Sequence, residues 1–285
     1  MLVITGANGK LGRLIAEETA KRVPVSTVTL ATRDPAKIAD LGARGFKTAR
    51  ADFDDAASLT AAFKGAKAVV IISGDTPNDV RIRQHRAAVD AAKAAGVGRI
   101  VYTSFVSPGE KSLFPFSAIH SDTEAYIKAS GVPFTILRDN QYAENLTNVV
   151  AGAKQSGTLA LPGARGKVAY ITRADTAAAI AGALTQDGHA GKIYDLTGPE
   201  ALDAFEIAAV LGQSLGKAVT AVDADPADFA KVFAAHGLPP FLIEALLGLY
   251  AAAGAGECAN VSGDAAKLAG RPIEPVSAFV RRIAA

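Results

Sequence analysis

The stretch TGANGKLGRLIAE, residues 5–17, places three glycines between an apolar run and a helical pattern. Glycine inside regular structure costs about 0.5–1 kcal/mol relative to alanine, so packing alone does not favour such a cluster. Gly6 would permit a tight turn, Gly9 would let backbone amides approach a ligand, and Gly12 would let the next helix pack closely. The free amides and the positive dipole end of that helix favour a bound phosphate.

The setting of these glycines strengthens the interpretation. Their spacing is G-x-x-G-x-x-G rather than the common G-x-G-x-x-G, but an apolar run precedes them and a helical pattern follows. That strand-turn-helix context is the one in which a dinucleotide pyrophosphate is bound. The alternative is a glycine-rich turn without a ligand. Asn8, Lys10 and Leu11 lie between the glycines, and we predict that they join the cofactor site.

Short β-branched runs alternate with longer alanine-rich helical patterns over the first half of the chain. Predicted strands are 2–5, 27–31, 47–51, 68–72, 99–103 and 134–138, and predicted helices are 10–22, 35–43, 56–64, 79–95 and 118–130. This alternation is typical of parallel βαβ units. It predicts an α/β fold with a Rossmann-like, doubly wound parallel sheet, whose ligands lie beyond the carboxyl ends of the strands.

The pattern is less regular in the second half. Predicted helices are 142–155, 173–186, 203–215, 226–236, 239–252 and 275–283, and predicted strands are 158–161, 167–171, 192–196 and 218–223. We interpret 1–141 as an NADP-binding Rossmann domain and 142–285 as a smaller C-terminal α/β domain that caps the sheet and binds substrate. No linker rich in proline, serine or charge separates the two, so we expect them to be interleaved.

The choice between NADP and NAD depends on the end of the second strand, where an acid would accept the ribose 2′-hydroxyl of NAD. The sequence there is LATRDP, with Arg33 at the strand end. A guanidinium suits a 2′-phosphate, and Asp34 followed by Pro35 suits a helix N-cap. The prediction is therefore NADP(H). The alternative is that Arg33 is a solvated charge and Asp34 turns to the ribose.

Polar or small residues also follow the next two strands. Asp52 closes the third strand, where its carboxylate would accept from the adenine amino group or cap a helix. Ser73 and Gly74 follow the fourth strand and would bring a small, amide-rich backbone close to the cofactor. These predictions rest on position and depend on the first glycine cluster.

Composition excludes several classes of protein. Of 285 residues, 49% are hydrophobic and 20% charged, and the formal net charge is only +2, so neither nucleic acid nor a membrane surface is an expected partner. Cys258 is the single cysteine and no secretory signal is evident, which favours a reducing cytoplasm. The four histidines are scattered singly, so no metal site is expected.

Several segments together resemble a known family. They are TGANGKLG (5–12), Arg33, QHRAAVDAAKAAGV (84–97), VYTS (101–104) and LRDNQYAENL (137–146). The chain resembles the NmrA-like, atypical members of the short-chain dehydrogenase/reductase superfamily, in particular the bacterial NADPH-dependent quinone oxidoreductases and triphenylmethane reductases. The resemblance implies a Rossmann domain, a small substrate domain and NADPH. It also implies that Asp139, Asn140, Gln141 and Tyr142 line the nicotinamide and its ribose.

The chain departs from the wider superfamily in its catalytic pair. Classical members carry Tyr-x-x-x-Lys on the helix after the fifth strand, whereas Tyr126 and Lys128 here are two residues apart and point to different helix faces. His120 is a candidate proton donor, with backbone bonding at the helix start as the structural alternative. Ser104 and Tyr142 are candidates to orient the substrate, or simply to bond the cofactor.

Two functions from different classes fit these features. The first is an NADPH-dependent reductase that transfers hydride to a quinone or a similar conjugated, aromatic small molecule, because such an acceptor needs little help with protonation. The second is a non-catalytic NADP-binding redox sensor of the NmrA type. Ser104, Asn140 and Tyr142 near the expected nicotinamide favour the enzyme. The sequence allows a homodimer but decides neither the oligomeric state nor the acceptor.

Overall fold

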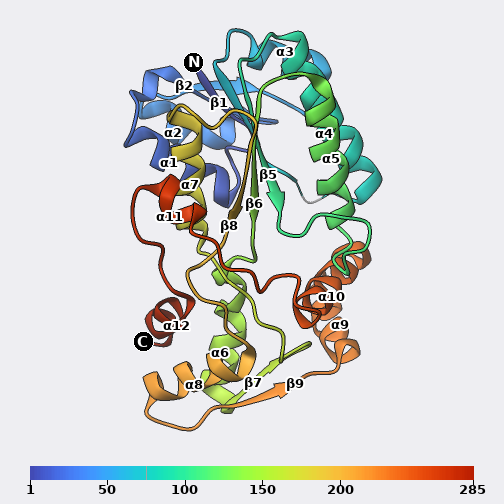
Figure 1. Ribbon diagram of the computed structural model, residues 1–285, viewed down its shortest axis with the longest axis vertical. Coiled ribbons are helices and arrows are strands. Elements are labelled where there is room, and N and C mark those ends of the chain that lie inside the picture. Colours follow the sequence, from blue (N-terminus) through green and yellow to red (C-terminus); the bar gives the residue numbers. More distant parts are fainter. Residues whose placement is uncertain (75) are drawn as a thin grey trace.

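A seven-stranded parallel sheet forms the centre of the computed structural model, which describes residues 1–74 and 76–285 (Figure 1). Its strands are β1 (Leu2–Ile4), β2 (Val28–Thr32), β3 (Lys47–Arg50), β4 (Ala68–Ile71), β5 (Ile100–Phe105), β6 (Phe134–Asp139) and β8 (Lys192–Leu196). The strand order is β3-β2-β1-β4-β5-β6-β8. Successive strands are added toward one side of β1 up to β3 and toward the other side from β4 onward. Doubly wound sheets bind ligands at this switch point between β1 and β4. The predicted Rossmann-like fold is confirmed.

Helices cover both faces of this sheet. One face carries α1 (Lys10–Ala20), η2 (Pro35–Ile38), α2 (Ala39–Ala43), α7 (Arg173–Thr185) and α11 (Asp264–Ala269), and the other carries α3 (Ala56–Phe63), α4 (Asn78–Ala94) and α5 (Ser117–Ser130). Neighbouring residues of one strand enter opposite cores: Val3 packs with α3 and α4, whereas Ile4 packs with α1 and α7. Because both of their faces are buried, the central strands β1 and β4 are continuous apolar runs rather than alternating ones.

Two helix ends show the features expected of helix caps. Asp34 caps η2 by accepting a hydrogen bond from the Ala36 amide, and Pro35 occupies the first helical position. Gly96 follows the last turn of α4 with φ +66°, a conformation that glycine adopts without strain. Gly96 lies before β5, at the amino edge of the sheet, whereas Asp34 follows β2 and lies at the carboxyl edge, where the site is.

A smaller α/β unit lies beyond that edge, in the lower half of Figure 1. It contains η3 (Ala143–Leu146), α6 (Thr147–Ser156), β7 (Thr158–Leu161), α8 (Ala204–Leu215), β9 (Thr220–Asp223), α9 (Pro226–Ala235), α10 (Pro240–Gly254) and α12 (Val276–Ala284). β7 and β9 pair in parallel as a two-stranded sheet, and the unit has its own apolar core around Leu159 and Leu211. In the described part of the chain, no helix has the length and apolar character needed to cross a bilayer.

Three details differ from the sequence prediction. The strand predicted at 167–171 is wrong: this segment makes only isolated bridges, from Val168 to Leu202 and from Ile171 to Tyr142, because it crosses between the two units. The strand at 192–196 is correct but pairs with β6 as the seventh strand of the main sheet. The short helix α11 was not predicted. Residues 142–285 therefore contribute to both parts of the molecule.

Candidate functional site

A cavity of about 710 Å³ opens at the carboxyl edge of the sheet, above the switch point between β1 and β4. Its size is within the usual range of cofactor sites. The structure brings all of the predicted site residues to its wall: Gly6, Asn8, Gly9, Lys10, Leu11, Gly12, Arg33, Asp52, Ser73, Gly74, Ser104, His120, Asp139, Asn140, Gln141 and Tyr142. These residues come from the carboxyl ends of β1 to β6 and the segments that follow them, and His120 comes from α5.

The glycine turn forms the floor of one end. Gly6 has φ +61°, and a Cβ at Gly12 would lie 2.3 Å from the Gly6 carbonyl oxygen and 2.9 Å from the Ala7 Cα. The turn and the first turn of α1 therefore touch through their backbones. Gly9 is the N-cap of α1 and offers no side-chain cap, so the first amides of the helix remain open toward the cavity. This geometry suits a phosphate group.

Arg33 lies beside this turn at the end of β2. It is exposed and makes no ion pair with the residues that the structure describes, whereas Asp34 is occupied by its cap to Ala36. A solvated guanidinium at this position is available to a phosphorylated ribose, and the neighbouring carboxylate is turned away. The geometry fits the predicted choice of NADP(H).

The two predictions for Asp52 can be compared directly. One of its oxygens accepts from the Asp54 amide at 3.1 Å, and the other lies 3.6 Å from Arg50. The cap of α3 is Asp55 instead, whose side chain accepts from the Ser58 amide. Asp52 thus closes a turn rather than capping the helix, and it faces the cavity.

Ser73 supplies a test of whether the cavity fits a cofactor. Its amide donates to Thr103 Oγ1 at 3.0 Å, but its own buried hydroxyl has no hydrogen-bond partner among the described residues. Buried hydroxyls are normally paired, so an unpaired one on a cavity wall indicates a missing ligand or water. Together with the open helix start and the free guanidinium, it shows that these residues fit a dinucleotide.

Asn140 and Gln141 connect the end of β6 to the C-terminal segment. Asn140 Nδ2 donates to the Cys258 carbonyl oxygen at 2.9 Å, and Gln141 Nε2 lies 3.6 Å from Cys258 Sγ. Burial raises the pKa of that thiol to about 11, so it stays protonated. Both amides therefore serve as structural ties, and they still contribute to the cavity wall.

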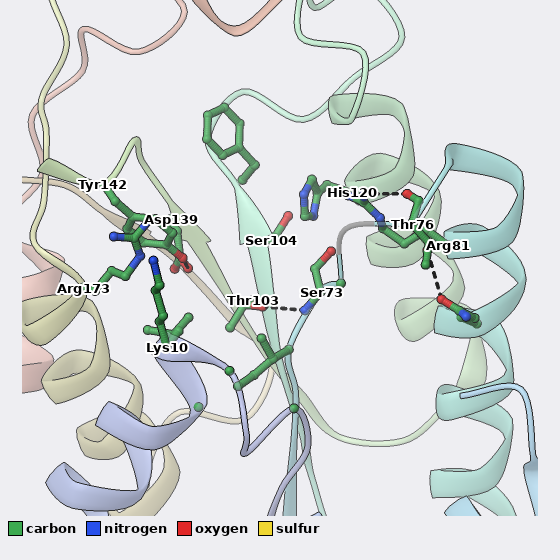
Figure 2. Close-up of a pocket in the computed structure, with 18 of the residues that line it drawn as sticks. Lys10, Ser73, Thr76, Arg81, Thr103, Ser104, His120, Asp139, Tyr142 and Arg173 are labelled. Carbon is green, nitrogen blue, oxygen red and sulfur yellow. Dashed lines mark hydrogen bonds between the residues drawn. The ribbon is translucent and has the colours of Figure 1, made fainter. Parts of the chain in front are cut away.

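His120, on α5, lies on the opposite wall from Tyr142 (Figure 2). Its Nδ1 lies 2.9 Å from the hydroxyl of buried Tyr102, which also approaches His85. Burial, followed by the charge of Arg81, lowers the pKa of His120 to about 3. At neutral pH the imidazole is therefore uncharged. The sequence had suggested His120 as a proton donor near neutral pH, and its surroundings do not favour an imidazolium.

Ser104 is held by an ionic network below the cavity wall. It donates to Glu124 Oε1 at 2.8 Å, and Arg138 binds both oxygens of the same carboxylate at 2.9 and 2.8 Å. Burial raises the pKa of Glu124, but the hydrogen bonds from Arg138 and Ser104 together lower it by more. The net shift of the pKa is downward. Glu124 therefore stays ionised, and the Ser104 hydroxyl proton points to its carboxylate.

The residues of the incomplete catalytic pair do not reach the cavity. Tyr126 donates to Asp90 on α4 at 2.9 Å, and Lys128 pairs with Glu124 at 3.3 Å. Neither is part of the cavity wall. They bind different partners on different faces of α5, as their spacing predicted.

One part of the cavity wall is aromatic. Phe105 at the end of β5 and Phe114 in the following loop have ring centroids 4.7 Å apart, and Leu249 of α10 completes this part of the wall. Sequence analysis missed these three residues and Arg173. The only signal was that Phe105 directly follows the VYTS strand; Leu249 and Arg173 come from distant helices that carry no local motif.

Glu257 holds the loop that carries Phe114. Its carboxylate accepts from the Ser112 hydroxyl and from the Leu113 amide, the latter at 2.9 Å, and its carbonyl oxygen accepts from Ser107 Oγ at 2.9 Å. Ser107 has φ +51°, a strained value for a residue other than glycine. Several bonds to one residue therefore keep this loop against the C-terminal segment.

We predict that Glu257→Ala loosens this loop. Two charge-assisted hydrogen bonds disappear, so trypsin should cleave after the exposed Lys111 about 5- to 30-fold faster, as expected for 1–2 kcal/mol of lost local stability. Limited digestion followed by mass spectrometry measures the rate. Glu244→Ala, at an exposed position of α10, is the control and should leave cleavage unchanged. Equal cleavage in the two variants would contradict the prediction.

Fold and cavity together define a dinucleotide-binding α/β protein. The sequence profile of the NAD(P)H-binding family matches residues 6–187, and the chain belongs to this family. This match covers the glycine turn, Arg33 and the β6 segment. The cofactor of the family is thus the one that the site geometry fits.

The similarity to known relatives covers nearly the whole chain. Quinone oxidoreductase 2 of Escherichia coli is 36% identical over 283 residues, which are 99% of this chain and 98% of that protein. Its structure in complex with NADPH superimposes with a TM-score of 0.92 over 99% of each chain. The NADP(H) complex of Citrobacter sp. triphenylmethane reductase gives a TM-score of 0.93 at 30% identity, over 99% of this chain and 100% of that one. The resemblance predicted from the sequence is confirmed.

Proposed function

We propose that this protein is an NADPH-dependent reductase that transfers hydride to a quinone or a similar flat, conjugated acceptor. The observation that carries the proposal is the single cavity wall that joins an open helix start and Arg33 at one end to Phe105 and Phe114 at the other. The first end suits the diphosphate and the phosphorylated ribose. The aromatic end suits a planar ring.

The cofactor would supply the hydride, and the chain would supply position. Ser73, Asn140 and Tyr142 also line the cavity, and in this proposal the nicotinamide meets the acceptor beside them. A quinone that receives hydride becomes an aromatic hydroquinone anion, and one contribution of the protein is to hold the reacting atoms about 3–3.5 Å apart. The names of the E. coli and Citrobacter relatives support this class of acceptor.

The experiment that tests the proposal follows the absorbance of NADPH and NADH in the presence of quinones, triphenylmethane dyes and simple carbonyl compounds. We expect oxidation of NADPH with at least one quinone or dye, and little with plain aldehydes. Tight binding of NADPH with no turnover on any of them would contradict a reductase and favour a redox sensor. Failure to bind either dinucleotide would contradict both.

A separate prediction concerns the choice of cofactor. Arg33→Ala should weaken NADPH binding about 10- to 100-fold, because a hydrogen-bonded ion pair to the 2′-phosphate contributes about 1.5–3 kcal/mol. NADH lacks that phosphate, so its affinity should change little. Calorimetric titration measures both. Arg281→Ala, an exposed arginine of α12, is the control; equal losses for NADPH and NADH in Arg33→Ala would contradict the assignment.

A further inference from the structure

Asp139, which is buried, and Tyr142, which is half-buried, form an acid pair on the cavity wall. The Tyr142 hydroxyl donates to Asp139 Oδ2 at 2.9 Å. Asp139 is only 4% exposed, and its second oxygen, Oδ1, has no hydrogen-bond partner among the described residues. Both residues line the cavity, on the wall opposite His120 (Figure 2). A buried carboxyl oxygen without a partner is uncommon in a folded protein and suggests a role beyond packing.

The surroundings of the pair favour a protonated carboxyl. Burial raises the pKa of Asp139 to about 7, and the hydrogen bond from Tyr142 opposes this shift only in part. Titratable or charged groups on four neighbouring elements face the pair. They are Tyr102 on β5, Glu144 on η3, Arg173 on α7, whose guanidinium lies 4.6 Å from the Tyr142 ring centre, and Lys10 on α1.

The other polar groups of this wall are poorly suited to deliver a proton. His120 is uncharged at neutral pH because burial lowers its pKa to about 3. Ser104 already donates to Glu124. A protonated Asp139 could instead donate to the Tyr142 oxygen across the same 2.9 Å contact, since a carboxylic acid has one donor, and the tyrosine hydroxyl would then turn toward the cavity.

We propose that Tyr142 protonates the reduced acceptor and that the Asp139 carboxyl returns a proton to Tyr142. The inference rests on the proposed reductase function. An acceptor that has gained a hydride carries one negative charge, and one proton neutralises it. Tyr142 breaks its O–H bond to give that proton, Asp139 breaks its own to restore the phenol, and the resulting carboxylate regains a proton from water. Asp139 acts through Tyr142 and is a positioning and proton-storing residue, whereas Tyr142 contacts the acceptor.

The pH dependence of the variants tests this inference. Wild-type turnover should fall above about pH 7, as Asp139 loses its proton. Turnover of Asp139→Asn should be about 100-fold slower than wild type at about pH 6, and it should not change with pH around pH 7. Asparagine keeps an acceptor for Tyr142 but cannot store a proton. Tyr142→Phe should be equally slow and leaves the ring against Arg173. Asp122→Asn is the control and should behave as wild type. Asp122 lies on α5 and forms an ion pair with Arg86 of α4.

A second measurement needs no cofactor. Infrared or carboxyl NMR titration of the dinucleotide-free protein should show one carboxyl that titrates at about pH 7, which is absent in Asp139→Asn and present in Asp122→Asn. Full activity of Asp139→Asn at about pH 6, or no such carboxyl, would overturn the inference while wild-type turnover still supports a reductase. Absence of turnover in wild type itself would overturn both.

Discussion

Gly12→Ala should weaken NADPH binding about 100-fold, which corresponds to about 2.7 kcal/mol. The added Cβ would lie 2.3 Å from the Gly6 carbonyl oxygen, far inside van der Waals contact. That oxygen belongs to the backbone and cannot rotate away. The start of α1 must therefore move from the glycine turn. Its amides then lose their alignment with the diphosphate, where hydrogen bonds to a charged group contribute about 1.5–3 kcal/mol each. Fluorescence or calorimetric titration with NADPH measures the loss.

The matched control for this substitution is Gly152→Ala. Gly152 lies in α6, is exposed, and has open space where a Cβ would be placed. Alanine favours a helix over glycine by up to about 1 kcal/mol, so this variant should be slightly more stable and bind NADPH as wild type does. If Gly12→Ala bound NADPH with unchanged affinity, the glycine turn would not be the diphosphate site.

Asp139→Asn should remove a large pH dependence of stability. The carboxyl has a pKa of about 7 in the folded protein, raised by burial, against about 3.9 in an unfolded chain. Between these values the folded state holds more protons than the unfolded state, so stability decreases as pH rises and levels off above pH 7. Linkage gives a loss of about 2–3 kcal/mol between about pH 5 and about pH 8 from this group alone.

Urea unfolding of wild type and Asp139→Asn across that range measures the effect. The variant should gain about 2–3 kcal/mol relative to wild type on going from about pH 5 to about pH 8. Asp122→Asn corrects for the general effect of removing a carboxylate. A constant difference between wild type and Asp139→Asn over the whole range would show that the buried carboxyl is ionised throughout, and would contradict the acid pair inferred for the cavity.

The parts of the site that the sequence predicted are those set by local chain geometry. Gly6, Gly9 and Gly12 lie within one strand-turn-helix unit, and their spacing together with that setting predicts both the turn and its ligand. Residues at the ends of parallel strands, such as Ser73 and Ser104, could be placed because those ends meet at one edge of the sheet. Neither inference needed the second half of the chain.

The missed residues come from contacts between distant segments. Leu249 and Arg173 enter the cavity from helices more than a hundred residues beyond the glycine turn, and neither carries a local pattern. The segment 167–171 is apolar because it crosses between two cores, which produces the same composition as a buried strand. The partner of 192–196 could not be chosen because β pairing joins segments far apart in sequence.

The sequence by itself determined the Rossmann-like sheet, the phosphate-binding turn and the edge of the sheet at which the site lies, since each depends on residues that are close along the chain or on a simple alternation of elements. Only the tertiary structure decided the protonation of the polar groups at the site. Burial leaves His120 neutral, an ion pair keeps Glu124 charged, and desolvation favours a proton on Asp139. Such shifts arise from the dielectric surroundings and charges that several distant segments create together.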